Sequence, residues 1–146
     1  MISISHIDHF VLTVHSIEAT CDFYSQVLGM ECIEFSEGRK ALKFGNQKIN
    51  LHLKGKEFKP HASHPKSGSA DICFITDCPI KDVVSSLTAA SIQIECGPIG
   101  RTGAEGKIES VYIRDPDGNE VELYVDGDPK IWKDDPSAIV SPIKPL

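Results

Sequence analysis

The sequence predicts an α+β fold in which two βαβββ modules form an incompletely closed eight-stranded sheet around a shared pocket. Three observations support this prediction. The order strand, helix and three strands occurs twice along the chain. The end of the first strand, Val14, lies in register with Thr76, and Ile17 of the first helix matches Ile80 of the second after a one-residue gap. Matched strands also alternate apolar and polar residues in the same sense, which is typical of a duplicated unit.

The first module covers residues 6–54. Its opening stretch, IDHFVLTV, alternates apolar and polar side chains as a strand with one buried face does. Apolar residues at helical spacing predict a helix from Ile17 to Leu28, with Ser16 as N-cap and Gly29 as C-terminal stop. Glycine-containing turns separate three further strands. Their predicted ranges are Met30 to Phe35, Lys40 to Phe44 and Lys48 to Leu53.

A polar stretch at 55–69 lacks periodicity and is predicted to be a linker. The second module, residues 70–125, repeats the pattern with a helix from Pro79 to Ala90 and a glycine-rich loop at 97–106. The motif DPDGN at 115–119 is a strong signal for a hairpin turn. Its predicted strands are Ala70 to Thr76, Ile92 to Cys96, Ile108 to Arg114 and Glu120 to Val125. Residues 1–125 thus form a single domain, and residues 126–146 form a C-terminal tail.

Composition excludes several classes of partner. The net charge of −6, from 15 basic and 21 acidic residues, offers no basic face for nucleic acid. No secretory signal or membrane-spanning stretch is recognisable, so we expect a cytoplasmic protein without membrane partners. The five cysteines are odd in number, lack a CxxC spacing and mostly lie in apolar runs. We therefore expect reduced, buried thiols rather than a disulfide framework or a zinc knuckle.

Metal-ligand side chains occur on the polar faces of the first and last strands of both modules. His9 and Asp71 occupy equivalent positions on the first strands, while Asn50, His52 and Glu122 lie on the last strands. If the two sheets curl towards each other, these side chains converge. Imidazole and carboxylate groups bind divalent ions such as zinc, iron, manganese, nickel or cobalt. The pattern therefore predicts a divalent metal ion as cofactor in the shared pocket.

Two segments resemble a known superfamily. The stretch from Ile7 to Gly29 is similar to the opening of glyoxalase, bleomycin-resistance and extradiol-dioxygenase domains, and DPDGNEVEL at 115–123 resembles their closing motif. The resemblance to this vicinal oxygen chelate superfamily covers about residues 6–125. It implies metal ligands on the first and last strands of each half. By position these are His9, Asn50, Asp71 and Glu122.

Two of these positions depart from the family pattern. Many relatives carry histidine where Asp71 stands, and glyoxalase I enzymes carry a proton-transferring glutamate where Asn50 stands. An amide cannot act as a general base, whereas His52 on the same strand face could replace the missing ligand or base. The predicted metal ligands are therefore His9, Asp71 and Glu122. The candidate catalytic residues are His52 and Tyr112, the second because it alternates onto the polar side of its strand.

Each candidate also has a purely structural interpretation. His9 could be a hydrogen-bonded core histidine, Glu122 a solvated strand residue and Asp71 part of a turn. His52 could be an exposed edge residue, and Tyr112 could cover an exposed sheet face. Arg101 in the glycine-rich loop could close on an anionic substrate or stay in solvent.

The function that the sequence favours is metal-dependent chemistry, of the glyoxalase or dioxygenase type, on a small oxygenated substrate. The metal would chelate two neighbouring oxygens and stabilise an enolate or oxyanion as a Lewis acid. The alternatives are a metal-free module that sequesters a small molecule and an interaction domain with a vestigial pocket, since fold alone does not choose a reaction. The expected partners are a small-molecule substrate and a second copy of the chain, because relatives are often homodimers.

Overall fold

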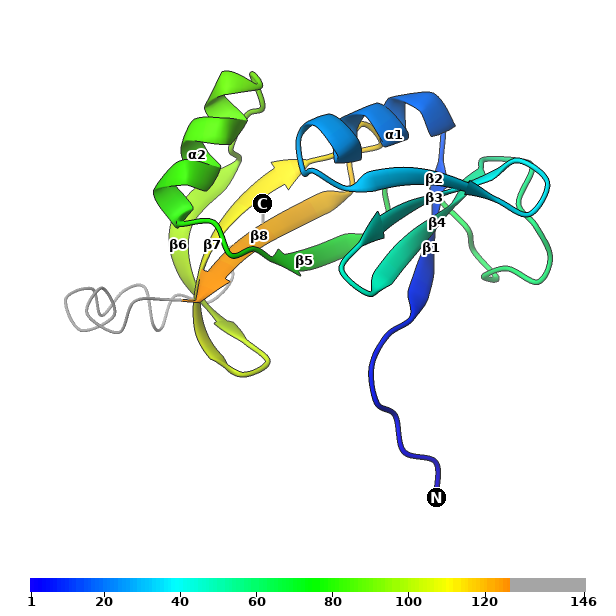
Figure 1. Cartoon of the computed structure of the whole chain (residues 1–146), viewed down its shortest axis with the longest axis horizontal. Coiled ribbons are helices and arrows are strands. Elements are labelled where there is room, and N and C mark those ends of the chain that lie inside the picture. Colours follow the sequence, from blue (N-terminus) through cyan, green and yellow to red (C-terminus); the bar gives the residue numbers. More distant parts are fainter. Residues whose placement is uncertain (127–146) are drawn as a thin grey trace. The chain divides into compact units, whose positions relative to one another are not determined.

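The computed structural model describes residues 1–126, which divide into two units (Figure 1). The first unit contains Met1–Ala70 and the turn Asp115–Asn119, and the second contains Asp71–Arg114 and the strand that starts at Glu120. The predicted tail at 126–146 lies outside the described residues apart from the backbone of its first residue. No helix within residues 1–126 is long and apolar enough to cross a membrane.

The first unit contains one helix and a four-stranded mixed sheet in the order β1-β4-β3-β2. The Ser16 side chain caps the helix by accepting a hydrogen bond of 3.1 Å from the backbone N–H of Ala19, as predicted. The helix ends before Gly29, whose φ of +68° is a conformation that glycine adopts without strain. The elements are β1 (His9–Val14), α1 (Ile17–Gln26), β2 (Glu31–Phe35), β3 (Arg39–Phe44) and β4 (Gln47–Leu53).

The second unit repeats this arrangement, with strand order β5-β8-β7-β6. In each unit the strand before the helix pairs in parallel with the last strand, and the other pairings are antiparallel. The two βαβββ modules and the α+β class are therefore confirmed, and each sheet is open at its edges. The elements are β5 (Asp71–Ile75), α2 (Ile80–Ala89), β6 (Cys96–Gly103), β7 (Gly106–Arg114) and β8 (Glu120–Asp126).

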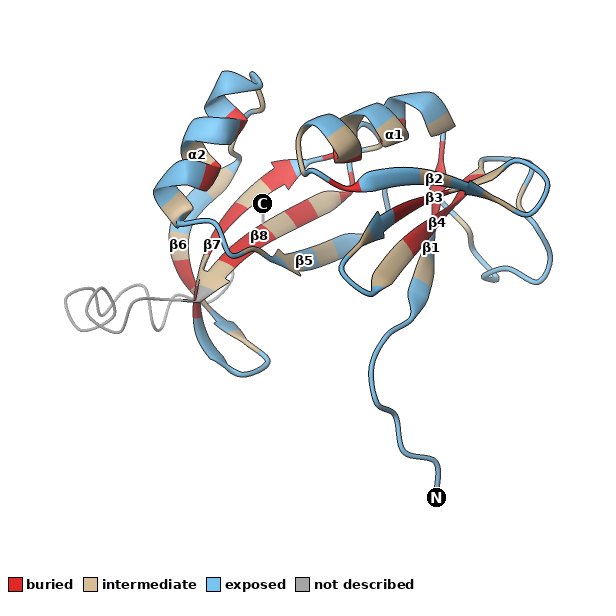
Figure 2. Ribbon diagram, in the orientation of Figure 1, coloured by how far each residue is buried: buried red, intermediate tan, exposed pale blue. Residues whose placement is uncertain are grey.

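Buried residues occur on the strands of both sheets and on both helices (Figure 2). In the first unit they include Leu12 and Val14, two members of the face predicted to pack under the helix. In the second unit Val121 and Leu123 of β8 are buried together with Leu87 of α2. The other face of the first sheet carries two polar residues that the sequence singled out, Asn50 and His52, and these are buried as well.

The prediction of a glycine-rich loop at 97–106 is wrong. Most of this segment is strand β6, which pairs antiparallel with β7, with a shift in register between Cys96 and Ile99. Gly97 has a φ of +102°, and a side chain there would collide with the backbone of Ser110. Glycine thus permits close strand pairing here. The sequence-based prediction failed because these glycines interrupt the alternation that identifies a strand.

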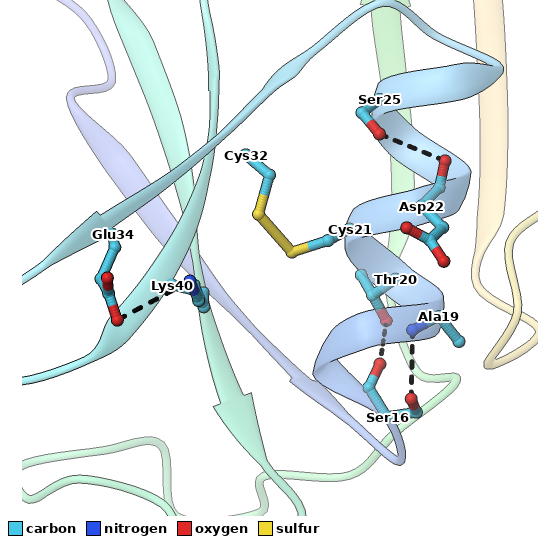
Figure 3. Close-up of a disulfide and its surroundings, with 9 residues drawn as sticks. All are labelled: Ser16, Ala19, Thr20, Cys21, Asp22, Ser25, Cys32, Glu34 and Lys40. Atoms are coloured by element: carbon cyan, nitrogen blue, oxygen red, sulfur yellow. Dashed lines mark hydrogen bonds and ion pairs between the residues drawn. A yellow bond between two sulfur atoms is a disulfide. The ribbon is translucent and has the colours of Figure 1, made fainter.

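The expectation of reduced, buried cysteines is also wrong. Cys21 on α1 and Cys32 on β2 form a disulfide, with their Cα atoms 5.7 Å apart (Figure 3). Cys73 and Cys78 are free and exposed, and Cys96 is free and half-buried. Spacing along the chain does not reveal that α1 packs on β2 and brings two cysteines together.

This disulfide closes a short loop, because its cysteines are 11 residues apart in sequence. Replacing both Cys21 and Cys32 with serine is expected to lower the free energy of unfolding by about 3 kcal/mol, the chain-entropy value for a loop of this order. The control Cys78→Ser changes an exposed thiol and should shift stability by less than about 0.5 kcal/mol. Urea unfolding of both variants measures the difference. Labelling of all five cysteines in the unreduced, denatured protein would show that the bond does not form.

Candidate metal and ligand site

His9 lies at the start of β1 with its side chain 47% exposed. Its Nδ1 is 2.6 Å from Oδ1 of Asp8, and because a carboxylate only accepts, the ring donates this hydrogen bond. The interaction with His9 is also the main reason why the pKa of Asp8 falls below its ordinary value. In the neutral form of the ring, a proton on Nδ1 leaves the lone pair on Nε2. A carboxylate that fixes the tautomer in this way is a common partner of metal-binding histidines.

Next to β1, strand β4 brings Asn50 and His52 onto the same face. The parallel pairing places Val11 beside Asn50 and Thr13 beside His52. Both polar side chains are buried, with exposed fractions of 7% and 2%. The interpretation of His52 as an exposed edge residue is therefore wrong, because β4 lies inside the sheet between β1 and β3.

Arg39, which the sequence analysis overlooked, contacts His52 from strand β3. Its Nη2 lies 3.4 Å from Nε2 of His52, and its guanidinium stacks over the rings of Phe35 and Phe58 at 5.1 and 4.3 Å. Burial and the neighbouring Arg39 lower the pKa of His52, so the imidazole is neutral at pH 7.

Three buried polar atoms on this face have no hydrogen-bond partner within residues 1–126. They are Nε of Arg39, Oδ1 of Asn50 and Nδ1 of His52. Buried polar atoms are nearly always paired, and exceptions often mark a place where a ligand or water binds. This face of the first sheet thus carries hydrogen-bond donors and an acceptor that have no partner within residues 1–126.

In the second unit, Glu122 on β8 lies between Cys73 on β5 and Tyr112 on β7, its direct neighbours in the sheet. Desolvation of the thiol, followed by the negative charge of Glu122, raises the pKa of Cys73 to about 12, although the residue as a whole is exposed. Burial also raises the pKa of Tyr112 to about 12, and Glu122 again contributes. Both groups therefore keep their protons at neutral pH beside the carboxylate of Glu122.

Asp71 belongs to the same polar face of the second unit. It is exposed, and its register partner on β8 is Glu120. Burial raises the pKa of Glu120, and the charges of Asp71 and Glu122 add to this effect while Arg114 opposes it. Arg114 bonds Glu120 at 3.2 Å, whereas no ion pair within residues 1–126 engages Asp71 or Glu122. Asp71 and Glu122 therefore add negative charge to this face without an ion-pair partner of their own, which favours a cation.

The donor types fit a divalent metal ion: an imidazole with a fixed tautomer and two carboxylates without cationic partners. Across the described chain, however, no group of three or more histidine, cysteine, aspartate or glutamate side chains stands together as a ready metal site. The assignment of His9, Asp71 and Glu122 as ligands therefore stays a prediction, as do the catalytic roles of His52 and Tyr112.

Arg101 lies on strand β6 rather than in a loop. Its Nε donates a hydrogen bond of 3.1 Å to the hydroxyl of Tyr112, and its guanidinium lies 5.5 Å from the centre of that ring. Arg101 therefore lies beside Tyr112 on a strand, rather than in a loop that closes on a substrate or stays in solvent. It places a positive charge beside the phenol that contacts Glu122.

The DPDGN motif forms the predicted turn, but its side chains do more than end a hairpin. Asp115 is 5% exposed and accepts four hydrogen bonds: from the backbone N–H groups of Asp117 and Asn119, the amide of Asn119 and the hydroxyl of Tyr24. Asn119 in turn accepts a bond from the N–H of Ala70. The motif is therefore a buried structural network that joins the turn to α1 and to the end of the linker.

The sequence analysis overlooked Asp8, Arg39 and Tyr24, and only the first of these had a recognisable local signal. Asp8 precedes His9 directly, and a carboxylate next to a candidate ligand is a recognisable signal. Arg39 and Tyr24 carry no such local signal, because their partners are 13 and 91 residues away in sequence.

Comparison with known proteins adds to this geometry. A model of the glyoxalase/bleomycin resistance protein/dioxygenase superfamily matches residues 6–123. The chain belongs to this superfamily. A member from Salmonella typhimurium, virulence protein STM3117, is 58% identical over 120 residues, which cover 82% of this chain and 83% of the relative. Its crystal structure has a TM-score of 0.84 and covers 85% of this chain and 98% of that one, at 56% identity.

Other superfamily members carry names that describe a domain or an activity. Glyoxalase domain-containing protein RDO1 from Mycosarcoma maydis is 51% identical over 84% of this chain and 69% of its own length. Catechol-2,3-dioxygenase from Bacillus subtilis is 27% identical over 90% of this chain but only 45% of its own length. The structure of lactoylglutathione lyase from Agrobacterium tumefaciens has a TM-score of 0.66 and 27% identity, covering 89% of this chain and 98% of that one.

Proposed function

We propose that this protein binds a divalent metal ion through His9, Asp71 and Glu122 and acts on a small oxygenated substrate. The observation that carries the proposal is the hydrogen bond of 2.6 Å between Nδ1 of His9 and Asp8. It leaves Nε2 as the nitrogen with a free lone pair, which a metal requires. When bound, the metal supplies Lewis acidity that stabilises negative charge on two neighbouring substrate oxygens.

The neighbours of these residues have defined tasks in this proposal. Asp8 holds the His9 ring in one tautomer. Tyr112 and Cys73 keep their protons and are the strand neighbours of Glu122, so both can donate to its carboxylate. Arg101 donates a hydrogen bond to the hydroxyl of Tyr112 and so holds it in place.

Membership of the superfamily supports the proposal, because two relatives are named as a catechol dioxygenase and a lactoylglutathione lyase. The finer assignment to either reaction is part of the proposal. So is a particular likeness to glyoxalase domain-containing protein 5, which the sequence motifs suggest. The choice between lyase and dioxygenase depends on whether a residue of the site can move the substrate proton.

Substitution of the ligands tests the proposal directly. His9→Ala and Glu122→Ala are each expected to weaken metal binding by at least ~10-fold, since even the loss of a group behind a ligand has this effect. Asp8→Ala should weaken binding by a similar factor of about 10, because it removes the acceptor that fixes the tautomer. Calorimetric titration of chelator-stripped protein with Zn²⁺ or Mn²⁺ gives the affinities.

Two exposed residues provide matched controls, His6→Ala for the histidine and Glu105→Ala for the glutamate. Both should bind metal as the wild type does. If all of these variants bind with equal affinity, the ligand assignment is wrong.

A further inference from the structure

Asp117, His15 and Ser67 form a connected row of side chains within the first unit. His15 directly follows β1, Ser67 belongs to the linker and Asp117 to the DPDGN turn. Nδ1 of His15 is 2.7 Å from Oδ1 of Asp117, and Nε2 of the same ring is 3.5 Å from Oγ of Ser67. Carboxylate, imidazole and hydroxyl in this order are the groups that activate a serine for nucleophilic attack.

Asp117 fixes the imidazole of His15 in one orientation. Its side chain is only 3% exposed, and its Oδ1 accepts hydrogen bonds from both the backbone N–H and the ring Nδ1–H of His15. The backbone N–H of Asp117 donates in turn to Oδ1 of Asp115 at 2.9 Å, which ties the acid to the buried network of the turn. Because a carboxylate only accepts, the proton of the neutral ring lies on Nδ1 and the lone pair on Nε2. His15 can therefore take up a proton at Nε2.

The linker brings Ser67 to this nitrogen. Gly68 has a φ of +73°, and a side chain there would collide with the backbone carbonyl of Asp117, so glycine lets the linker lie directly on the turn. Since Nε2 carries no proton in the neutral ring, the hydroxyl of Ser67 is the donor in their contact. The distance of 3.5 Å is long, as it often is between a nucleophile and its base before a substrate binds.

Lys54 adds a positive charge at the same point, because its Nζ also lies 3.5 Å from Nε2 of His15. The side chain of His15 is 61% exposed, Lys54 is exposed and Ser67 is half-buried, so a molecule from solution can reach all three. An ammonium group in this place can stabilise the negative charge that develops on a carbonyl oxygen when Ser67 attacks. The row thus offers a nucleophile, a base and a cation for the oxyanion.

We propose that Ser67 is the nucleophile of a second active site, which hydrolyses small carboxylic esters. Oγ of Ser67 forms a bond to the ester carbonyl carbon while its proton passes to Nε2 of His15. The bond between that carbon and the leaving oxygen breaks, and the leaving group takes the proton from His15. A water molecule then attacks the acyl-serine and gives one proton to His15, which returns it to Oγ as the carboxylic acid departs. No step needs a metal ion, so this activity is independent of the function proposed above.

Hydrolysis of p-nitrophenyl acetate in the presence of EDTA tests this site without metal. The wild type should release nitrophenolate faster than buffer alone, and Ser67→Ala and His15→Ala should each lower this rate by at least ~100-fold, the lower end of what a general base supplies. Ser69→Ala and His61→Ala are matched controls from the same linker, whose side chains contact the backbone carbonyls of Lys66 and Ala62 instead. Both should keep the wild-type rate. Equal rates in the wild type and in a folded Ser67→Ala protein would overturn the proposal.

Labelling with a fluorophosphonate gives a second measurement that needs no variant. The oxygen of Ser67 displaces fluoride from phosphorus while His15 takes the hydroxyl proton, which leaves a phosphonyl group of known mass on the serine. Mass spectrometry of the peptides should find this group on Ser67 and on no other serine, and protein denatured in urea should stay unlabelled. An unlabelled Ser67 in folded wild-type protein, together with hydrolysis no faster than in buffer, would also overturn the proposal. The contacts of His15 would then serve only to hold the linker on the turn.

Discussion

Replacing Asp115 with alanine is expected to lower the free energy of unfolding by about 3–5 kcal/mol, since it leaves several buried groups without partners. The Tyr24 hydroxyl and the Asn119 amide each donate to Oδ2 of Asp115 at 2.8 Å. Tyr24 is fully buried and Asn119 is 1% exposed, so neither group can turn to solvent. Burial and Asp115 together raise the pKa of Tyr24, so its hydroxyl stays protonated and continues to need an acceptor.

Tyr24→Phe is the matched control for this network. It removes one donor but leaves Asp115 with its other three hydrogen bonds, so a loss of about 1.5–3 kcal/mol is expected. Urea unfolding of both variants gives the two free energies. If Asp115→Ala unfolds like the wild type, the motif has no structural role of this kind.

Turnover of the glutathione–methylglyoxal hemithioacetal is expected to be poor or absent, about 10²–10⁴-fold below that of an enzyme with a general base at this position. Asn50 stands where glyoxalase I relatives carry a glutamate, and its amide takes up no proton. His52 is the neighbouring candidate, but its Nε2 lies against Arg39 and its pKa is lowered. A base needs a free lone pair, and this one faces a donor.

The assay follows thioester formation with added zinc, nickel or cobalt, and the lactoylglutathione lyase of Agrobacterium tumefaciens serves as positive control. Turnover at ordinary enzyme rates that persists in His52→Ala would contradict the argument about both residues. Turnover that His52→Ala abolishes would make His52 the base. Without hemithioacetal activity, a panel of catechols with ferrous iron is the next experiment, because ring cleavage needs open metal positions rather than that glutamate.

The repeated element order was predictable because each unit alternates buried and exposed residues regularly. Ser16 and Gly29 marked the ends of α1, and the DPDGN motif marked the turn between β7 and β8. Strand β6 was not predictable, since its glycines remove the side chains on which periodicity depends. The disulfide was missed for a different reason: the cysteine pattern carries no information about helix packing.

The candidate site, like the fold, could be predicted only in part from the sequence. His9, Glu122 and their strand faces could be read from alternation and from the family motifs. The orientation of His9 by Asp8 needed coordinates, and so did the contact of Arg39 with His52. Sequence alternation assigns a residue to a face, but it does not show which hydrogen bonds on that face are left unmade.

Metal content is the most direct measurement of the central claim. Protein purified without chelator, and never exposed to added metal, is analysed for divalent ions by elemental analysis. The account predicts stoichiometric metal in the wild type and a clear reduction in His9→Ala and Glu122→Ala. Metal-free wild-type protein that takes up none on titration, yet binds a small molecule tightly, would contradict it and identify a metal-free binding module instead.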